Sequence, residues 1–329
     1  TLMLITIALA WCADHVAFGP VKHNRRQRLI VCTVVIIILL AGFAGLRTRC
    51  NDTVTYRYSY KLLTEKLWEA SDKSIGSNPL FNWVNYRLKM HGVSTQNFLM
   101  FWAFLTVGCY FIFVHKYSVN YPLTIFLLFV TGCYTFAFAG IKQAAAVGIS
   151  VIATMFALKK KWLLFAVGIL IATLIHPYSL MYLAVPFMTF KPWTKITYWM
   201  LAAFIAAGFL LRPLLGTVVN ITTLLGEEYT VSSFTGDGVN MFRVLVCNVP
   251  MVLFADSSEA ENLAMNLTML NGAIMFDGLF GTANYFARLA NYFLIFQSLS
   301  LPWMLKKIGG RDGKVLTILM VLGYAAYFY

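Results

Sequence analysis

Isolated basic side chains interrupt the apolar stretches of this sequence, and their chemistry is that of anion binding. A lone cation near the centre of a bilayer costs about 2.5–3.5 kcal/mol or more, so such residues usually face a cavity or a partner. Guanidinium groups bind phosphate through two parallel N–H donors, whereas an ammonium group acts as a point charge. We therefore expect a site for a phosphate-bearing anion. The basic residues concerned are Arg47, Arg49, Lys142, Arg212, Arg243 and Arg288.

The segment LIHPYSLMYL at 174–183 adds a titratable group. Imidazole has an ordinary pKa of about 6.5, which suits proton transfer near neutral pH. Pro177 discourages helix at the residue before it, so His176 lies at a break where backbone groups suit a ligand-lined cavity. His176 is the first candidate for a general base and Asp52 the second; packing in an apolar core is the alternative for His176. Ser179 either contacts a ligand or hydrogen-bonds within its own helix.

The composition indicates a membrane protein. Hydrophobic residues make up 60% of the chain and charged residues 12%, with a mean hydropathy of +0.71, whereas soluble domains carry about 25% charged residues. A crossing helix needs roughly 17–25 mostly apolar residues, so we expect an all-α polytopic bundle of about 10–12 transmembrane helices in a single domain, 1–329. The expected spans are 1–18, 29–46, 98–114, 121–139, 142–157, 162–175, 177–189, 197–212, 241–256, 265–280, 284–302 and 315–329.

The spans 162–175 and 177–189 are short for full crossings. Because Pro177 separates them, they form two crossings, one long broken helix or a re-entrant hairpin. The sequence leaves these three arrangements open.

Lysine and arginine in the short connections predict the orientation. Basic residues cluster in 19–28, 158–161 and 303–314, which we place in the cytoplasm. Four isolated cations, Lys142, Arg212, Arg243 and Arg288, then all lie at the outer end of their spans, as do His176 and the pair Arg47 and Arg49 after the span 29–46. Snorkelling toward headgroups is the alternative for any one of these side chains. Seven basic or titratable side chains at one depth favour an outer-leaflet site for a lipid diphosphate. The net charge of +13 follows from this topology, and no nucleic-acid partner is expected.

Segment 47–97 is expected to be extracytoplasmic and to hold amphipathic helices in the headgroup region. Tyr56, Tyr60, Leu63 and Leu67 share one helical face, and Leu80, Val84 and Leu88 share another. Two helices of a soluble cap domain are the alternative. The expected interfacial anchors are Tyr58, Trp68 and Trp83. A second extracytoplasmic loop is expected at 213–240.

The sequence lacks GxxxxGK[ST], HExxH, DxD and any Cys/His spacing typical of metal sites. We therefore expect no metal and no cofactor. The remaining chemistry is one in which cations stabilise an anionic leaving group while one base activates a nucleophile.

Four segments together resemble the EpsG family of Wzy-like polysaccharide polymerases, which are GT-C-type membrane glycosyltransferases. GLRTRCNDTVTY at 45–56 is similar to the family's Gly-Leu-Arg followed by Asp and Tyr, and GIKQAAA at 140–146 to its Arg-Gln-Ala stretch. LIHPYSL at 174–180 is similar to its His-x-Ser, and FARLANYF at 286–293 to its late Arg with a downstream Tyr. The resemblance covers the order of elements from about 40 to 300.

The chain departs from the family pattern at three places. The glycine usual between the first Arg and the Asp is missing, with Arg49 and Cys50 nearby instead. Lys142 replaces the commoner arginine, which keeps the charge but loses the bidentate fork. Asn78 stands near the place of an acidic residue, which removes support for a catalytic acid there.

The resemblance implies polymerisation of exopolysaccharide, capsule or O-antigen repeat units at the outer face of the cytoplasmic membrane. A glycan on polyprenyl (undecaprenyl) diphosphate is the implied donor, and a lipid-linked repeat unit is the acceptor. A chain-length regulator and a flippase are the implied protein partners. Arg47, Arg243 and Arg288 would hold the diphosphate, with Lys142 assisting and Arg49 in reserve, while His176 or Asp52 would act as the base. The expected contacts to sugar come from Gln143, Ser179, Tyr56, Tyr285 and Tyr292.

Other classes of function remain open. A flippase or transporter of an anionic lipid also needs cations facing a cavity, although it should carry charges along its whole path. A glycan ligase differs from a polymerase only in its acceptor. A non-catalytic scaffold would leave His176 and Lys142 without a role.

Overall fold

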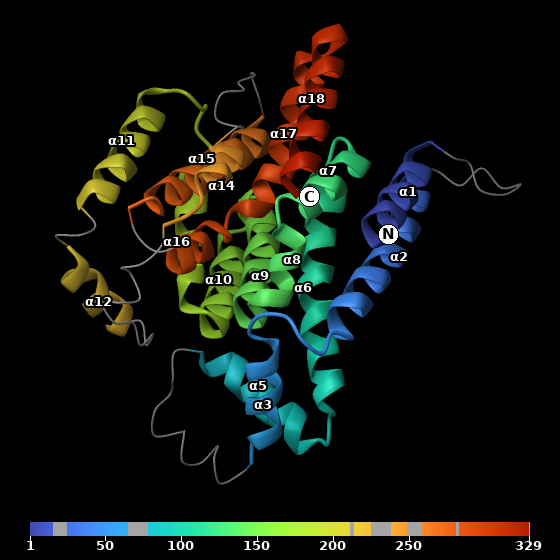
Figure 1. Ribbon diagram of the computed structural model, residues 1–329, viewed down its shortest axis with the longest axis vertical. Coiled ribbons are helices and arrows are strands. Elements are labelled where there is room, and N and C mark those ends of the chain that lie inside the picture. The colour runs from blue at the N-terminus through green and yellow to red at the C-terminus, as the bar shows by residue number, and fades with distance from the viewer. Residues whose placement is uncertain are drawn as a thin grey trace, which may run out of the picture. The chain divides into compact units, whose positions relative to one another are not determined.

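The computed structural model describes residues 1–15, 25–64, 78–210, 214–224, 238–248, 258–280 and 283–328. Within these ranges the chain is helical and contains no strand (Figure 1), which confirms the all-α class. Chain contacts divide it into two compact units, Thr1–Leu183 and Ala184–Tyr329. Arg212, Leu67, Trp68 and, from the loop expected at 213–240, residues 213 and 225–237 lie outside the described residues. Part of that expected loop, Leu215–Leu224, is helical.

Unit 1 is a bundle of long apolar helices joined to two shorter ones. Its core is the central helix α6, which packs against both α2 and α9. The helices are α1 (Leu2–His15), α2 (Arg25–Gly45), α3 (Thr53–Leu62), α5 (Pro79–Met90), α6 (Thr95–Tyr117), α7 (Tyr121–Val130), α8 (Cys133–Ala139), α9 (Ile141–Ala157) and α10 (Trp162–Ile175).

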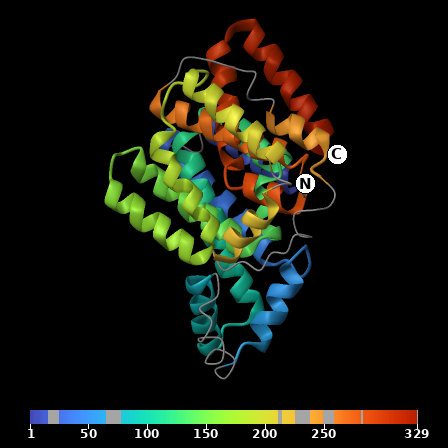
Figure 2. The ribbon, with the colours of Figure 1, turned by 90° about the vertical axis from the view of Figure 1, so that its left-hand side faces the viewer.

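Small residues let the helices of unit 1 approach closely, as is typical of membrane helices. A Cβ on Gly168 of α10 would lie 2.7 Å from the Cβ of Ala153 on α9. α9 and α10 accordingly form an antiparallel pair (Figure 2). The end of α9 and the start of α10 flank Lys159, Lys160 and Lys161, so one end of this pair is strongly basic.

Among the described residues, one helix is long and apolar enough to cross a membrane by itself. This helix is α6, with 23 residues. The expected span 121–139 is instead a pair, α7 and α8, bent by 46°. Gly132 lies between them with φ +83°, a left-handed backbone that favours glycine. Helix length therefore does not establish the expected bundle of about 10–12 transmembrane helices.

The break predicted at His176 is present. α10 ends at Ile175, His176 is extended with φ −154° and ψ 120°, and a 3₁₀ helix, η1, follows over Pro177–Phe187. The expected span 177–189 is therefore wrong as an α-helical crossing. Proline inside η1, at Pro186, removes a further donor from the backbone ladder.

The prediction that Tyr56, Tyr60, Leu63 and Leu67 form one helical face in the headgroup region is partly wrong. Tyr60 is buried and Tyr56 packs beside it, together with Phe81, Phe98 and Trp102. α3 also ends at Leu62, so Leu63 leaves the helix. The exposed apolar stripe of α3 is formed instead by Val54, Tyr58 and Leu62 at i, i+4 and i+8.

Unit 2 surrounds α15, which packs against α11, α14, α16 and α17. The expected span 284–302 is split by a turn at residues 291–293, where the Ala290 carbonyl accepts both the Phe293 N–H at 2.9 Å and the Asn271 amide of α15 at 2.6 Å. The helices are α11 (Lys195–Leu210), α12 (Leu215–Leu224), α14 (Met241–Asn248), α15 (Glu259–Asp277), α16 (Ala283–Ala290), α17 (Leu294–Ile308) and α18 (Gly310–Phe328).

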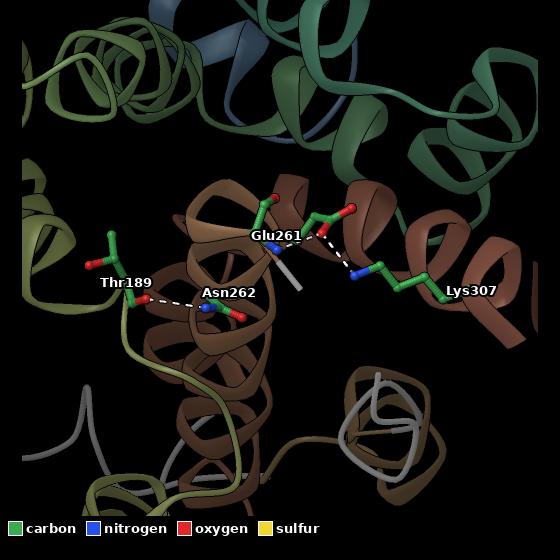
Figure 3. Close-up of polar contacts among 5 residues, drawn as sticks. Thr189, Glu261, Asn262 and Lys307 are labelled. Atoms are coloured by element: carbon green, nitrogen blue, oxygen red, sulfur yellow. Dashed lines mark hydrogen bonds and ion pairs between the residues drawn. The ribbon is translucent and has the colours of Figure 1, made fainter. Parts of the chain in front are cut away.

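Polar contacts fix the start of α15 (Figure 3). Glu261 accepts the backbone N–H of Ser258 at 2.8 Å and lies 3.1 Å from Lys307 Nζ of α17. Asn262 Nδ2 donates to the Thr189 carbonyl at 3.4 Å. These contacts join α15 to α17 and to the segment after η1.

Candidate functional site

Arg47 follows α2 and lies in a network of neutral acceptors. Its Nε donates to Thr53 Oγ1 at 2.9 Å, and one terminal nitrogen donates to the Ala44 carbonyl. Its guanidinium lies 5.8 Å from the ring centre of Phe138. Among the described residues no carboxylate lies within salt-bridge distance of Arg47. The half-buried charge of Arg47 therefore has no counter-anion within this part of the protein.

Thr53 joins three elements at this point. It is the first residue of α3, it accepts from Arg47, and its hydroxyl donates to the Phe138 carbonyl of α8 at 3.3 Å. Asp52 precedes it at the N-cap position, where its side chain makes no capping hydrogen bond. The positive end of the α3 dipole is thus close to Arg47.

Arg57, which lies one turn further along α3, is not among the site residues predicted from the sequence. One terminal nitrogen of Arg57 lies 3.4 Å from the Arg47 carbonyl and 3.5 Å from Gln96 Oε1. Gln96, at the start of α6, in turn donates to the Gly45 carbonyl. The segment TYRYSY around Arg57 reads as an ordinary amphipathic helix, and only the fold brings it back to the end of α2.

Burial changes the pKa of Arg47. Desolvation lowers the pKa of its guanidinium, and nearby Cys50, Tyr134 and Tyr56 act in the opposite direction. A guanidinium stays protonated at physiological pH. The desolvation nevertheless means that an anion binding here would interact more strongly than at an exposed surface.

Lys142 and Gln143 lie in the first turn of α9, only a few residues after Phe138. Lys142 is half-buried, and Gln143 is 5% exposed. Ile141, directly before them, packs in the same apolar cluster as Tyr60 and Trp102. The fold therefore brings the start of α9 to the end of unit 1 that carries Arg47.

His176 lies at this end as well, because Ile175 belongs to that apolar cluster. The His176 side chain is 6% exposed, and its ring lies 5.4 Å from that of Tyr178. Ser179 is completely buried and its Oγ has no hydrogen-bond partner among the described residues. The hydrogen bond considered for Ser179 within its own helix is therefore not formed.

The remaining residues of unit 1 lie nearer the surface. Arg49 is exposed, and Asp52 is half-buried. Tyr56 packs edge-on against Phe81, with ring centres 5.9 Å apart. Cys50 and Asn51, between Arg49 and Asp52, have φ values of 125° and 38°, so this turn holds non-glycine residues in left-handed backbone.

The other four selected residues belong to unit 2. Arg243 is half-buried on α14, and Arg288 is exposed on α16. Tyr285 is half-buried on α16, whereas Tyr292, in the following turn, is completely buried. Both α14 and α16 pack on α15. A single chamber containing these residues and those of unit 1 stays a prediction.

The described ranges contain no group of three or more His, Cys, Asp or Glu side chains arranged to hold a metal ion. The site residues placed above offer guanidinium, ammonium, hydroxyl and amide donors, beside the imidazole of His176 and the carboxyl group of Asp52. Such groups bind anions and hydroxyl-rich ligands.

Comparison with known proteins supplies the family. No curated protein and no solved structure matches the chain. The model of the EpsG family matches residues 30–329, which include every residue selected above. This family is associated with polysaccharide polymerases of the glycosyltransferase type, in keeping with the resemblance in the motifs. The protein belongs to the EpsG family.

Proposed function

We propose that the protein is a polytopic polysaccharide polymerase of the cytoplasmic membrane. It joins polyprenyl-diphosphate-linked oligosaccharide repeat units at the outer face by metal-independent glycosyl transfer. The observation that carries the proposal is Arg47, a half-buried guanidinium with neutral partners and no carboxylate among the described residues. Membership of the EpsG family supplies the class of reaction.

The bond changes follow from the chemistry of the donor. The acceptor hydroxyl attacks C1 of the donor sugar, the C1–O bond to the diphosphate breaks, and the lipid diphosphate leaves with the electron pair. Arg47 stabilises the charge that grows on the diphosphate, and Lys142 assists it. Arg243 and Arg288 are assigned the same role from unit 2.

The proton of the acceptor hydroxyl needs a base. His176 is assigned this role because its imidazole lies at the helix break, at the same end of unit 1 as Arg47. Asp52 is the second candidate. Ser179 and Gln143 are assigned to sugar hydroxyls, since the buried Ser179 Oγ lacks a partner in the described structure.

The placement of the basic groups favours an enzyme over a transporter of anionic lipids. In unit 1, Arg47, Lys142 and His176 lie at one end, and Lys159 to Lys161 lie at the other end of the α9–α10 pair. The intervening helix α9 consists of apolar, small and hydroxyl residues after Gln143. A path for a lipid diphosphate would need donors along this length.

The test uses the purified full chain, lipid-diphosphate-linked repeat units and a chelator, with no nucleotide. We expect a ladder of longer glycans with wild type and with Arg87→Ala, whose side chain is exposed on α5. Arg47→Ala should yield no ladder within the same time. Unchanged substrate with wild type, or equal ladders with wild type and Arg47→Ala, would reject the proposal. A ladder seen only after adding a different acceptor would indicate a ligase.

A further inference from the structure

Arg57 places a second guanidinium at the backbone of Arg47, and no acidic side chain among the described residues neutralises either arginine. Its two contacts, at 3.4 and 3.5 Å, are long and go to neutral oxygens of Arg47 and Gln96. Neither arginine has a carboxylate within 4.0 Å among the described residues. Two arginines thus lie at the junction of α2 and α3, and no acid in the described part of the chain neutralises them.

The contacts of Arg57 leave most of its donors unused. Both involve the same terminal nitrogen, whereas a guanidinium carries five N–H donors in a planar fork. The acceptor Gln96 is fixed because its own amide donates to Gly45. Within the described part of the chain, the Nε–H and the second terminal nitrogen of Arg57 therefore contact no acceptor, and the side chain is held in place rather than neutralised.

Arg47 shows the same arrangement. Thr53 accepts from its Nε and Ala44 from one terminal nitrogen, so the second terminal nitrogen has no acceptor among the described residues. Thr53 and Arg57 lie one turn apart on α3, on the same face of the helix. The two arginines thus lie at one junction, Arg47 at the end of α2 and Arg57 in the first turns of α3.

We propose that Arg57 is a second phosphate-binding residue that acts with Arg47, and that the pair recognises a diphosphate in preference to a monophosphate. The inference rests on the proposed function and deepens it, because it explains how the site distinguishes the diphosphate-linked donor from a polyprenyl monophosphate. Two guanidinium groups match two phosphate groups, each through a fork of N–H donors. A monophosphate neutralises only one of them well.

The test measures binding of farnesyl diphosphate and farnesyl monophosphate to the purified full chain in detergent, by calorimetry. We expect wild type to prefer the diphosphate, and Arg57→Gln to lose about tenfold or more in affinity for it. Affinity for the monophosphate should change much less. Arg57→Lys keeps the charge without the fork, so its loss should be intermediate. Arg87→Gln, which removes an exposed arginine from α5, should bind both probes as wild type does.

Three outcomes separate this inference from the proposed function. If wild type prefers the diphosphate and Arg57→Gln binds both probes unchanged, Arg57 has no part in recognition. Equal losses for both probes would show that Arg57 contributes general charge and no discrimination. If wild type itself shows no preference, the diphosphate-linked donor of the proposed function is in doubt. Should Arg57→Gln fail to fold, the ratio of the two affinities in Arg57→Lys decides, and a ratio equal to wild type overturns the inference.

Discussion

The Arg57 guanidinium lies 3.4 Å from the backbone carbonyl of Arg47. This contact joins the first turns of α3 to the end of α2, and neither arginine has a neighbouring acid in the described structure. The diphosphate that we propose as the ligand would supply the missing negative charge.

Replacement of Arg47 by lysine should separate the effect of charge from that of geometry. Arg47→Ala is expected to lower the rate of glycan transfer by about 10²–10³-fold, the usual effect of removing one preorganised donor. Arg47→Lys should fall between Arg47→Ala and wild type, because it keeps the charge but cannot reach Thr53 and Ala44 with a planar fork. Initial rates at saturating donor measure this. Equal rates for Arg47→Lys and wild type would contradict a role for the fork.

His176 should matter for turnover far more than for folding. His176→Ala is expected to lower kcat by about 10²–10⁴-fold, as for other general bases, while farnesyl diphosphate still binds. His176→Gln keeps a polar side chain of similar size and should lose as much activity. Near-normal turnover in a folded His176→Ala variant would remove this residue from the mechanism, and Asp52→Asn would become the next variant to measure.

Cys50 should be better replaced by glycine than by alanine. Its φ of 125° is a conformation that L-residues adopt at a cost of about 1–3 kcal/mol. Cys50→Gly should therefore raise the free energy of unfolding by about 0.5–1 kcal/mol after the entropy of glycine is deducted. Cys50→Ala keeps the strain and serves as the matched control. Thermal unfolding of the two variants in the same detergent measures the difference, and an equal midpoint would contradict it.

Glu261 should make stability depend on pH. Burial alone would raise the pKa of Glu261, but Ser258 and Lys307 outweigh burial, and its pKa lies below the ordinary 4.5. A carboxyl group whose pKa is lower in the folded state stabilises fully above pH 4.5, and this contribution is lost as the pH falls through the folded pKa. Glu261→Gln should cost about 0.5–1 kcal/mol at pH 7. The cost should vanish in acid.

Unfolding midpoints of wild type and Glu261→Gln between pH 7 and pH 3 give this dependence. Glu259→Gln removes an exposed charge from the same turn of α15 and should show a smaller change. A difference in unfolding midpoint between wild type and Glu261→Gln that widens as the pH falls would contradict this prediction.

The predicted orientation can be tested by cysteine labelling in intact cells, in a chain whose own cysteines are replaced. Lys161→Cys, in the basic turn before α10, should react with an impermeant maleimide only after the cells are opened. Asn82→Cys, exposed on α5, should react in intact cells. The reverse pattern would place Arg47 and His176 on the cytoplasmic side.

The sequence was most informative where local signals agree with the fold. The helix predicted at 162–175 is α10 with the same bounds, because the break at His176 and Pro177 is a property of the backbone itself. Such a signal needs no knowledge of distant partners. The anion-binding role inferred for Arg47 from its place after an apolar run stays a prediction.

Features that depend on distant contacts escaped the sequence. Arg57 is adjacent to Arg47 only because α3 returns to the end of α2, and the inward face of α3 is set by Phe81, Phe98 and Trp102. At the split of 284–302, the Asn271 amide adds a contact from α15 to the Ala290 carbonyl, which also accepts the Phe293 N–H of the turn. Hydropathy alone reports none of these.

The hydroxyl of Thr53 contacts both Arg47 and Phe138, and this has a consequence for biogenesis. The same hydroxyl that links α3 to α8 also orients the Arg47 guanidinium, so folding of this junction and orientation of the cation occur together. A nascent chain that has not yet closed the junction would lack an oriented Arg47.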